Sequence, residues 1–355
     1  MEPSTVGCIR ACGEDAGQPQ SNARVNESDA RMSNSDLYRC SVVIPVLNEE
    51  RTIRECLQSL ANSKLESDRF EVLVVDNGST DETVQIASSF ACRLSLAIIT
   101  KPGVTIAALR NAGAAAARGR VLAFLDADCC APAEWLELAA ATVEKEGGLV
   151  GGPYTVPPSY NWVAQVWSGR EVHTFRGARS YLHGGNLIVR RCDFLAVSGF
   201  DEALQTNEDF EFCQRARSAG FRISAFSELG VVHFGTVQEL RRFFRKQRWH
   251  GKDVLKVFLS NWRAKPNLRP LSFAVFTLLA AFGTCFGGVL WLAGGTSHVL
   301  VASLLALLAG PLLLSIRETV STPGPRNPIP LACLFLVYGL ARAACLIEPR
   351  ASIKR

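Results

Sequence analysis

Two carboxylates stand one residue apart in VLAFLDADCC, residues 121–130. Five apolar residues precede Asp126, and Asp128 follows after a single alanine. Because side chains alternate across an extended strand, the two carboxylates are predicted to point the same way, about 7 Å apart. Such oxygen ligands suit Mg²⁺ or Mn²⁺, and Mg²⁺ is usually held by one or two carboxylates plus substrate phosphates. The pattern favours a metal site that binds a diphosphate; the alternative is a pair of turn aspartates.

Four apolar runs alternate with segments of helical periodicity before and around these carboxylates. The runs are CSVVIPV (40–46), FEVLVVD (70–76), LSLAIIT (94–100) and VLAFLDAD (121–128), and helices are expected at 49–60, at 81–90 with Thr80 as N-cap, and at 105–119. Strands that are apolar throughout predict an α/β fold with a mostly parallel sheet covered on both faces. Ligands bind such sheets beyond the carboxyl ends of the strands, where Asp76 and Asp126 fall.

Basic residues gather between Arg241 and Arg269, where Asp253 is the only acid. Such a cluster just before an apolar stretch is typical of a segment on the cytoplasmic face, close to anionic lipid. No aromatic-rich module for RNA or DNA accompanies it, so nucleic acid is not expected as a partner.

Three long apolar segments follow, at residues 271–293, 299–316 and 329–347. The first two carry no charge, and about 20 helical residues suffice to cross a bilayer core. They are predicted to form a membrane hairpin; buried core helices are the alternative. The third carries Arg342 and precedes a basic tail, so it either spans the membrane or lies partly in the interface.

The cysteines and the polar N-terminal residues indicate how the rest of the chain is organised. The twelve cysteines show no CxxC pairing, which favours free thiols in a reducing compartment. Residues 1–36 are polar, have no apolar signal-peptide core and are predicted to be a disordered tail. The predicted order continues with a globular domain at 37–238, a basic amphipathic interfacial segment at 239–270 and the membrane segments at 271–347.

Seven short motifs, taken in order, resemble those of family 2 glycosyltransferases. They are IPVLNEE (44–50), VVDNGSTDET (74–83), LRNAGAAAARG (109–119), LDADC (125–129), GGN (184–186), NEDFEFCQRARSAG (207–220) and VVHFG (231–235). The resemblance covers roughly residues 40–250. It implies a Rossmann-like GT-A domain that binds a nucleotide-sugar, here followed by C-terminal transmembrane helices, and a reaction that inverts the anomeric carbon.

The resemblance also implies roles for the residues that follow the first two strands. Asp76 would accept the N3–H of a uracil ring, a role that suits an ionised carboxylate because it only accepts hydrogen bonds. Pro45, Asn48, Glu49 and Asn77 would line the same nucleotide-sugar site. The alternative for Asp76 is a turn aspartate that accepts bonds from backbone N–H groups.

Around the diphosphate, the resemblance implies two further groups and the metal ligands. Arg110 would lie near the donor phosphates, although a helical arginine could equally be a solvated charge. Asp126 would contact ribose and metal, and Asp128 would hold the Mg²⁺ or Mn²⁺ that bridges the phosphates. His233 would complete the metal site through an imidazole nitrogen, or be an ordinary core histidine.

The predicted catalytic pair is Glu208 and Asp209, at the start of an expected helix. A carboxylate that holds the metal is a poor proton acceptor, so the base should be a different acid. The resemblance assigns the second acid, Asp209, to deprotonating the acceptor hydroxyl. The alternative is that both acids stabilise the helix through its dipole.

Two further motifs complete the predicted site. In HGGNLIVRR (183–191), Gly185 and Asn186 would lie near the acceptor and donor phosphates, with a surface turn as the alternative. RKQRW (245–249) resembles the QxxRW element of membrane-bound polysaccharide synthases, in which Arg248 would face the diphosphate and Trp249 would stack on acceptor sugar. Arg245 stands where that element has Gln, and the membrane segments are few, so processive synthesis is not expected. A purely membrane-docking role for this amphipathic stretch is the alternative.

Together these features predict a metal-dependent inverting hexosyltransferase. It would transfer one sugar from a nucleotide-sugar to a membrane-associated glycan or lipid-linked acceptor, in polysaccharide or glycolipid synthesis. The expected donor is a UDP-sugar. The expected partners are this donor, this acceptor and membrane lipids, whereas protein partners are unknown. The expected location is a bacterial inner (plasma) membrane, multi-pass, with the catalytic domain in the cytoplasm. Two alternatives stay open: transfer to polyprenyl phosphate, and a non-catalytic membrane assembly factor with a sugar-nucleotide fold.

Overall fold

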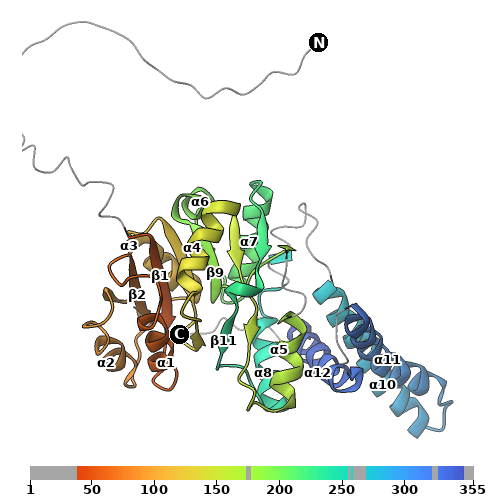
Figure 1. Ribbon diagram of the computed structural model, residues 1–355. Coiled ribbons are helices and arrows are strands. Elements are labelled where there is room, and N and C mark those ends of the chain that lie inside the picture. The colour runs from red at the N-terminus through yellow and green to blue at the C-terminus, as the bar shows by residue number, and fades with distance from the viewer. Residues whose placement is uncertain (1–37, 173–176, 255–256, 259–268, 322–326, 348–355) are drawn as a thin grey trace, which may run out of the picture. The chain divides into compact units, whose positions relative to one another are not determined.

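An eight-stranded sheet in the order β3-β2-β1-β4-β9-β6-β10-β8 forms the centre of the chain in a computed structural model, which describes residues 38–172, 177–254, 257–258, 269–321 and 327–347 (Figure 1). Its strands are β1 (Cys40–Val46), β2 (Phe70–Asp76), β3 (Leu96–Thr100), β4 (Val121–Leu125), β6 (Leu149–Gly151), β8 (Gly177–Ala178), β9 (Asn186–Arg190) and β10 (Ile223–Ala225). β1 pairs in parallel with β2 and β4, and β2 with β3. β9 runs antiparallel to both β4 and β6. The predicted α/β fold with a mostly parallel sheet is confirmed, whereas the predicted tail at 1–36 lies outside the described residues.

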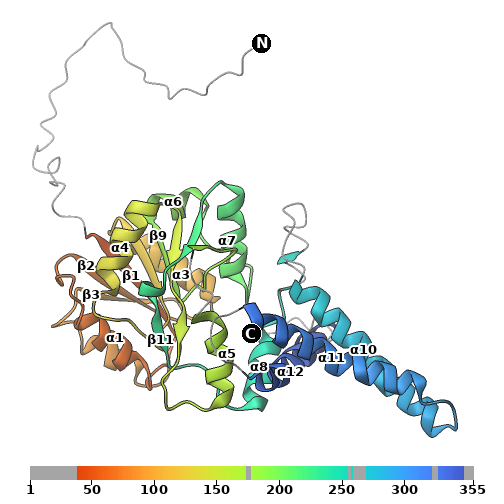
Figure 2. The same ribbon diagram turned by 45° about the vertical axis from the view of Figure 1, so that its right-hand side comes forward.

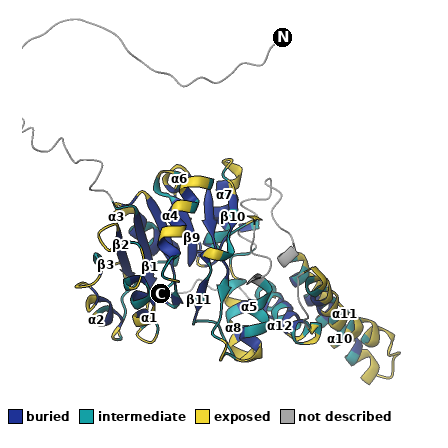
Figure 3. Cartoon of the chain, viewed as in Figure 1, coloured by how far each residue is buried: buried dark blue, intermediate teal, exposed yellow. Residues whose placement is uncertain are grey.

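Helices cover both faces of this sheet. They are α1 (Ile53–Ala61), α2 (Thr83–Ser88), α3 (Ile106–Ala116), α4 (Trp135–Glu146), α6 (Arg191–Ala196) and α7 (Glu208–Ser218). One core cluster unites α1, α2 and α4 with the sheet residues Val42 and Ile44, and a second unites α3, α6 and α7 with Val43. The alternation of Val42 and Val43 between the two clusters shows why apolar residues run continuously along these strands. Figure 3 shows the resulting buried interior.

The predicted start of the second helix is wrong. The structure begins α2 at Thr83, three residues after the predicted cap Thr80. Asp81 Oδ1 accepts hydrogen bonds from the backbone N–H and hydroxyl of Thr83, at 3.0 and 2.5 Å. This local bonding holds residues 81–83 in a turn, so the helix begins later.

A second sheet, in the order β5-β11-β7, lies beside the carboxyl end of β4. Its strands are β5 (Cys129–Cys130), β7 (Tyr154–Thr155) and β11 (Val231–His233), and the short helix η1 (Ser227–Leu229) precedes β11. β11 pairs antiparallel with β5 and in parallel with β7. This small sheet joins three segments that are distant in the sequence.

The C-terminal third of the chain is helical (Figure 2). Its helices α10 (Arg269–Leu292), α11 (His298–Ser321) and α12 (Pro328–Ile347) contain spans at 271–292, 298–321 and 328–347 that are long and apolar enough to cross a membrane. They pack on one another, and α12 also packs on α5 (Trp162–Val172) and α8 (Leu240–His250). The prediction of transmembrane helices is therefore confirmed by the length and apolar composition of these helices. The second helix extends to Ser321 rather than ending at 316.

α8 forms most of the described part of the predicted interfacial segment, of which residues 255–256 and 259–268 lie outside the described residues. Phe243 is buried with Val163 of α5 and Leu334 of α12. Leu240 and Trp249 stay exposed. One apolar side of α8 therefore packs on protein, which fixes the helix to α12.

Candidate active site

Asp126 and Asp128 lie at the carboxyl end of β4, where the strand stops. The predicted extended strand through Asp128 is wrong, because β4 ends at Leu125 and the N–H of Cys129 donates to the carbonyl of Asp126 at 3.0 Å. In this turn, the alternation of a strand no longer sets the side-chain directions. Asp126 contacts Arg110, and Asp128 contacts His233. The two carboxylates therefore have different partners.

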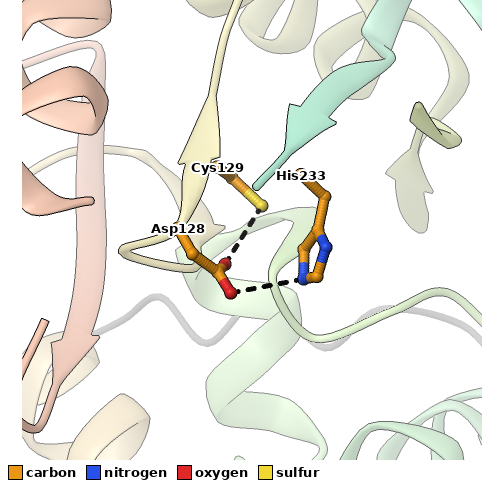
Figure 4. Close-up of side chains that lie close together, drawn as sticks. All are labelled: Asp128, Cys129 and His233. Carbon is orange, nitrogen blue, oxygen red and sulfur yellow. Dashed lines mark hydrogen bonds and ion pairs between the residues drawn. The ribbon is translucent and has the colours of Figure 1, made fainter. Parts of the chain in front are cut away.

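Asp128 and His233 form the candidate metal centre (Figure 4). His233 Nε2 lies 3.4 Å from Asp128 Oδ2, and the Nδ1 atom of the same ring hydrogen-bonds with the Thr236 hydroxyl at 2.7 Å. The hydroxyl fixes the ring, as a second layer of contacts commonly does for a metal-binding histidine. Burial lowers the pKa of His233, although Asp128 opposes this, and so favours the neutral imidazole that metals bind. An oxygen and a nitrogen donor therefore face the same space.

Cys129 lies within 4.8 Å of the same donor atoms. Its sulfur is 3.7 Å from Asp128 Oδ1, and the residue is fully buried. Burial, and then the charges of Asp126 and Asp128, raise the pKa of this thiol well above its usual value. A thiol binds metal as the thiolate, so Cys129 is a poor ligand here.

Pairing between β11 and β5 brings Asp128 and His233 together. His233 lies opposite Cys129 in the ladder, and the N–H of Phe234 donates to the carbonyl of Asp128 at 2.8 Å. Gly235 permits the approach, because a Cβ atom there would lie 1.8 Å from Asp128 Oδ2. These residues fit a divalent cation: the carboxylate oxygen and imidazole nitrogen converge, and the backbone leaves room for both.

Arg110 links the DxD turn to the predicted catalytic pair. It is only 2 % exposed, so the solvated-charge alternative is wrong. Its Nη2 lies 2.8 Å from Asp126 Oδ1, and its Nη1 lies 2.5 Å from Glu208 Oε1. Among the described residues, no partner is found for its buried Nε. One buried guanidinium therefore bridges two acids that lie far apart in the sequence.

The two predicted catalytic acids differ in their surroundings. Both lie in the first turn of α7, as expected. Burial, and then the neighbouring charge of Asp209, raise the pKa of Glu208 to about 7, while Arg110 opposes the shift. Asp209 is partly exposed and accepts a hydrogen bond from the N–H of Gly184 at 3.0 Å. Its Oδ1 accepts a second hydrogen bond, from the N–H of Phe210 at 2.7 Å, and within the described part of the chain it forms no salt bridge.

Tyr154 also contacts the candidate site residues, although no sequence motif indicates it. Its hydroxyl lies 3.4 Å from Asp126 Oδ2. Its ring stacks on His183 and His233, with centroids 5.0 and 4.8 Å apart. Its position in β7, next to β11, could not be predicted, because a strand of two residues has no recognisable sequence pattern. The tyrosine therefore contacts both Asp126 and His233 of the metal pair.

Gly185 and Asn186 lie beneath Asp126. A Cβ atom at Gly185 would lie 2.0 Å from Asp126 Oδ2, which explains the glycine. Asn186 is fully buried and donates to the carbonyls of Leu229 and Gly152, at 2.8 and 3.2 Å. These hydrogen bonds fix the backbone segments that lie beneath Asp126. The predicted contact of Asn186 with phosphates stays a prediction.

The residues after β1 and β2 mainly bond with one another. Asp76, 3 % exposed, accepts from the N–H groups of Gly78 and Ser79, each at 3.0 Å, which is the turn role considered as its alternative. Asn48 Oδ1 accepts from the N–H of Thr80 at 2.8 Å. These bonds shape the edge of the sheet beside the site. The predicted nucleobase contact of Asp76 stays a prediction.

Three more predicted donor-site residues lie at this edge. Pro45 is buried in β1, opposite Val75 of β2. The side chain of Asn77 bonds with the backbone of Val104 in both directions. Burial raises the pKa of Glu49, and so do the charges of Asp128 and Asp126, which places Glu49 close to the DxD turn.

Arg248 and Trp249 lie in the last turn of α8, both exposed. The carbonyl of Arg248 accepts a hydrogen bond from Cys345 Sγ of α12 at 2.8 Å. The Trp249 ring lies at the edge of the His250 ring, with centroids 4.9 Å apart. Their predicted roles with donor and acceptor stay predictions.

Comparison with known proteins gives consistent matches. The pattern described as "Glycosyl transferase family group 2" matches residues 121–343, and "Glycosyl transferase family 2" matches residues 41–197. Glycosyltransferase AglE of Haloferax volcanii is 30 % identical over 63 % of this chain and 76 % of its own length. Succinoglycan biosynthesis protein ExoA of Rhizobium meliloti is 29 % identical over 74 % of this chain and 83 % of its own.

Among solved structures, mannosyltransferase PcManGT from Pyrobaculum calidifontis, in complex with GDP-Man and Mn²⁺, is similar to the chain. The match has a TM-score of 0.56 and 18 % identity, and it covers 87 % of this chain and 88 % of that one. At this identity the likeness shows the fold, which is the GT-A arrangement predicted from the motifs.

Proposed function

Because this chain belongs to glycosyltransferase family 2, we propose that it transfers one sugar from a UDP-sugar to a lipid-linked or other membrane-associated glycan acceptor, with inversion, in polysaccharide or glycolipid synthesis. The observation that carries the proposal is the division of acids around Arg110. Asp126 and Glu208 bind the guanidinium, Asp128 faces His233, and Asp209 remains without a salt bridge among the described residues. Separate acids are thus available for metal and for proton transfer.

In this proposal, Asp128 and His233 hold the divalent cation, with Asp126 beside them. The bound cation would neutralise the diphosphate that leaves. Mg²⁺ prefers a shell of oxygen ligands, whereas a transition-metal ion such as Mn²⁺ accepts an imidazole nitrogen more readily, so the mixed pair favours Mn²⁺ over Mg²⁺. PcManGT is described with Mn²⁺ and GDP-Man, which supports a divalent cation for this fold.

Asp209 acts as the base that takes the proton of the acceptor hydroxyl. The N–H of Gly184 holds its Oδ2 at 3.0 Å, and this bond orients the carboxylate while leaving lone pairs for the acceptor. Glu208 is bound to Arg110 and positions the start of α7. A positioned base contributes about 10²- to 10⁴-fold to such a reaction.

The membrane helices support the proposal that the acceptor is lipid-linked or otherwise associated with the membrane. Three helices could span a membrane, and the last of them packs on α8 beside the site. We place the chain in the inner membrane, with the catalytic domain in the cytoplasm, where the basic residues of α8 face anionic lipid. Anchoring raises the effective concentration of a lipid-linked acceptor at the site.

A thermal-shift panel of the full-length protein tests the donor and the metal together. UDP, GDP and their sugar conjugates are each added with Mn²⁺, with Mg²⁺ or with excess chelator. The expected result is stabilisation by UDP compounds that depends on the cation and is strongest with Mn²⁺. Equal stabilisation in excess chelator would contradict the proposal that a divalent cation is needed for donor binding. Stabilisation by GDP compounds alone would show that the donor nucleotide is GDP rather than UDP.

A further inference from the structure

Positively charged groups gather where α8 meets α12. Lys246 and His250 come from α8, and Arg342 comes from α12. Burial chiefly, and then the charges of Lys246, Arg342 and His183, lower the pKa of His250 to about 3, so its imidazole is neutral and the positive charge comes from Lys246 and Arg342. In the part of the chain that is described, no salt bridge involves Lys246, His250 or Arg342. We call these three residues the junction cluster.

Asp253, which follows α8, does not neutralise the junction cluster. Its Oδ2 accepts from the backbone N–H groups of Gln205 and Thr206, at 2.8 and 2.9 Å. This acid is therefore engaged by the loop before α7. Among the described residues, Asp253 forms no salt bridge with the junction cluster.

Arg342 carries buried donors without partners. Its Nη2 lies 3.4 Å from Oε1 of the buried Gln247, and its guanidinium lies 5.1 Å from the centroid of the Tyr338 ring. Its Nε and Nη1 are buried and have no hydrogen-bond partner among the described residues. An arginine in an apolar helix is costly, and such residues commonly serve function. The two unsatisfied N–H groups suit an anion with several oxygens.

The junction cluster also connects to the candidate active site. The carbonyl of His250 accepts from Asn207 Nδ2 at 3.0 Å, and Asn207 directly precedes the catalytic pair. Lys246 Nζ lies 3.4 Å from the carbonyl of Gly235, the residue packed against Asp128. The cluster thus contacts one loop that leads to Asp209 and another that borders the metal pair.

We propose that the junction cluster binds the phosphate or diphosphate group of a lipid-borne acceptor, with Arg342 as the main ligand. This inference rests on the proposed function and names the chemistry of its acceptor. Arginine recognises phosphate oxygens through paired N–H groups, and α12 offers an apolar surface for the lipid chain.

Binding of farnesyl diphosphate to the full-length protein tests the proposal. The protein is held in neutral phosphatidylcholine nanodiscs and saturated with UDP and Mn²⁺, so that the donor site is filled. Arg342→Gln is expected to weaken binding about tenfold or more, because charged hydrogen bonds are lost, and Arg342→Lys less. Arg241→Gln removes the same charge from the exposed face of α8 and should change binding less than about twofold.

Farnesol and inorganic pyrophosphate separate the two parts of the probe. Both should bind far more weakly than farnesyl diphosphate. Pyrophosphate that binds equally well would show a site for free phosphate, and competition with UDP would place the probe in the donor site. Either result, or unchanged binding by Arg342→Gln, overturns the proposal.

Two further measurements keep the outcomes distinct. Arg342→Gln should retain the thermal shift given by UDP and Mn²⁺; if it does not, Lys246→Gln replaces it as the deciding variant. If the wild type binds no nucleotide, the proposed function fails. The farnesyl diphosphate series, repeated without UDP, then still decides the role of the junction cluster.

Discussion

Glu208 Oε1 accepts a hydrogen bond from Arg110 Nη1 at 2.5 Å. The adjacent Asp209 instead accepts from the backbone N–H of Gly184 and forms no salt bridge with a described residue. Two neighbouring acids in one helical turn thus have different partners. One is bound to a buried cation, whereas the other accepts hydrogen bonds from the backbone N–H groups of Gly184 and Phe210.

Asp209→Asn should lower kcat about 10²- to 10⁴-fold, because an amide cannot take up the acceptor proton. The affinity for donor should change little, since the metal pair is untouched. Turnover with a purified lipid-linked acceptor and calorimetric donor binding measure the two effects. Asp68→Asn, which makes the same change at an exposed position, serves as the control.

The same variant separates the proposed reaction from transfer to polyprenyl phosphate. A phosphate acceptor is already an anion and needs no base. Near-normal turnover by a correctly folded Asp209→Asn protein would therefore contradict the assignment of the base and favour the alternative reaction.

Glu208→Gln should change how stability depends on pH. The pKa of Glu208 rises from an ordinary 4.5 to about 7 in the folded chain, chiefly through burial. A raised carboxyl pKa means that the folded state binds the proton more tightly, so this group disfavours folding as the pH rises from about 4.5 through about 7. The effect is at most about 3 kcal/mol.

Thermal unfolding of wild type and Glu208→Gln at about pH 5.5 and about pH 8 measures this effect. The Tm difference, wild type minus variant, should fall as the pH rises, because only the wild type must ionise a buried carboxyl. A difference that stays constant across this range would show that Glu208 has an ordinary pKa in the folded protein.

Much of the fold could be predicted from local sequence patterns. The runs at 40–46 and 70–76 became β1 and β2 with the same bounds, because a strand buried on both faces has a nearly continuous run of apolar residues. The apolar C-terminal segments became helices for a similar reason. Thr80 failed as a cap because Asp81 bonds with Thr83 and delays the helix, a competition that a residue list does not reveal.

The site was harder to predict because long-range pairing builds it. His233 reaches Asp128 only through the ladder between β11 and β5, and both strands are too short to carry a pattern. Arg110 lies on α3, and nothing in its neighbourhood in the sequence indicates that Asp126 and Glu208 enclose it. Tyr154 entered the site through a two-residue strand. The motifs therefore indicated the candidate residues, whereas the residues that each of them contacts became known only from the structure.

Substitution of the candidate metal ligands should separate Asp128 and His233 from Cys129. Asp128→Asn and His233→Ala should each weaken Mn²⁺-dependent UDP binding about tenfold or more, because each removes a donor atom from the cation. Cys129→Ala should retain the affinity for Mn²⁺, since burial keeps the thiol protonated. Titration of Mn²⁺ by electron paramagnetic resonance gives the affinities. A loss with Cys129→Ala equal to that with Asp128→Asn would make the sulfur a ligand.

Gly235→Ala tests the geometry of the metal pair without changing a donor atom. The added Cβ would lie 1.8 Å from Asp128 Oδ2, so the carboxylate must turn away from His233. Donor binding should then lose its dependence on Mn²⁺, while thermal stability without metal changes little. Gly169→Ala is the matched control, because a Cβ atom at Gly169 meets no atom within 4 Å and the residue lies within helix α5. If Gly235→Ala keeps the Mn²⁺ dependence of the wild type, Asp128 does not need its position beside His233 to bind the cation.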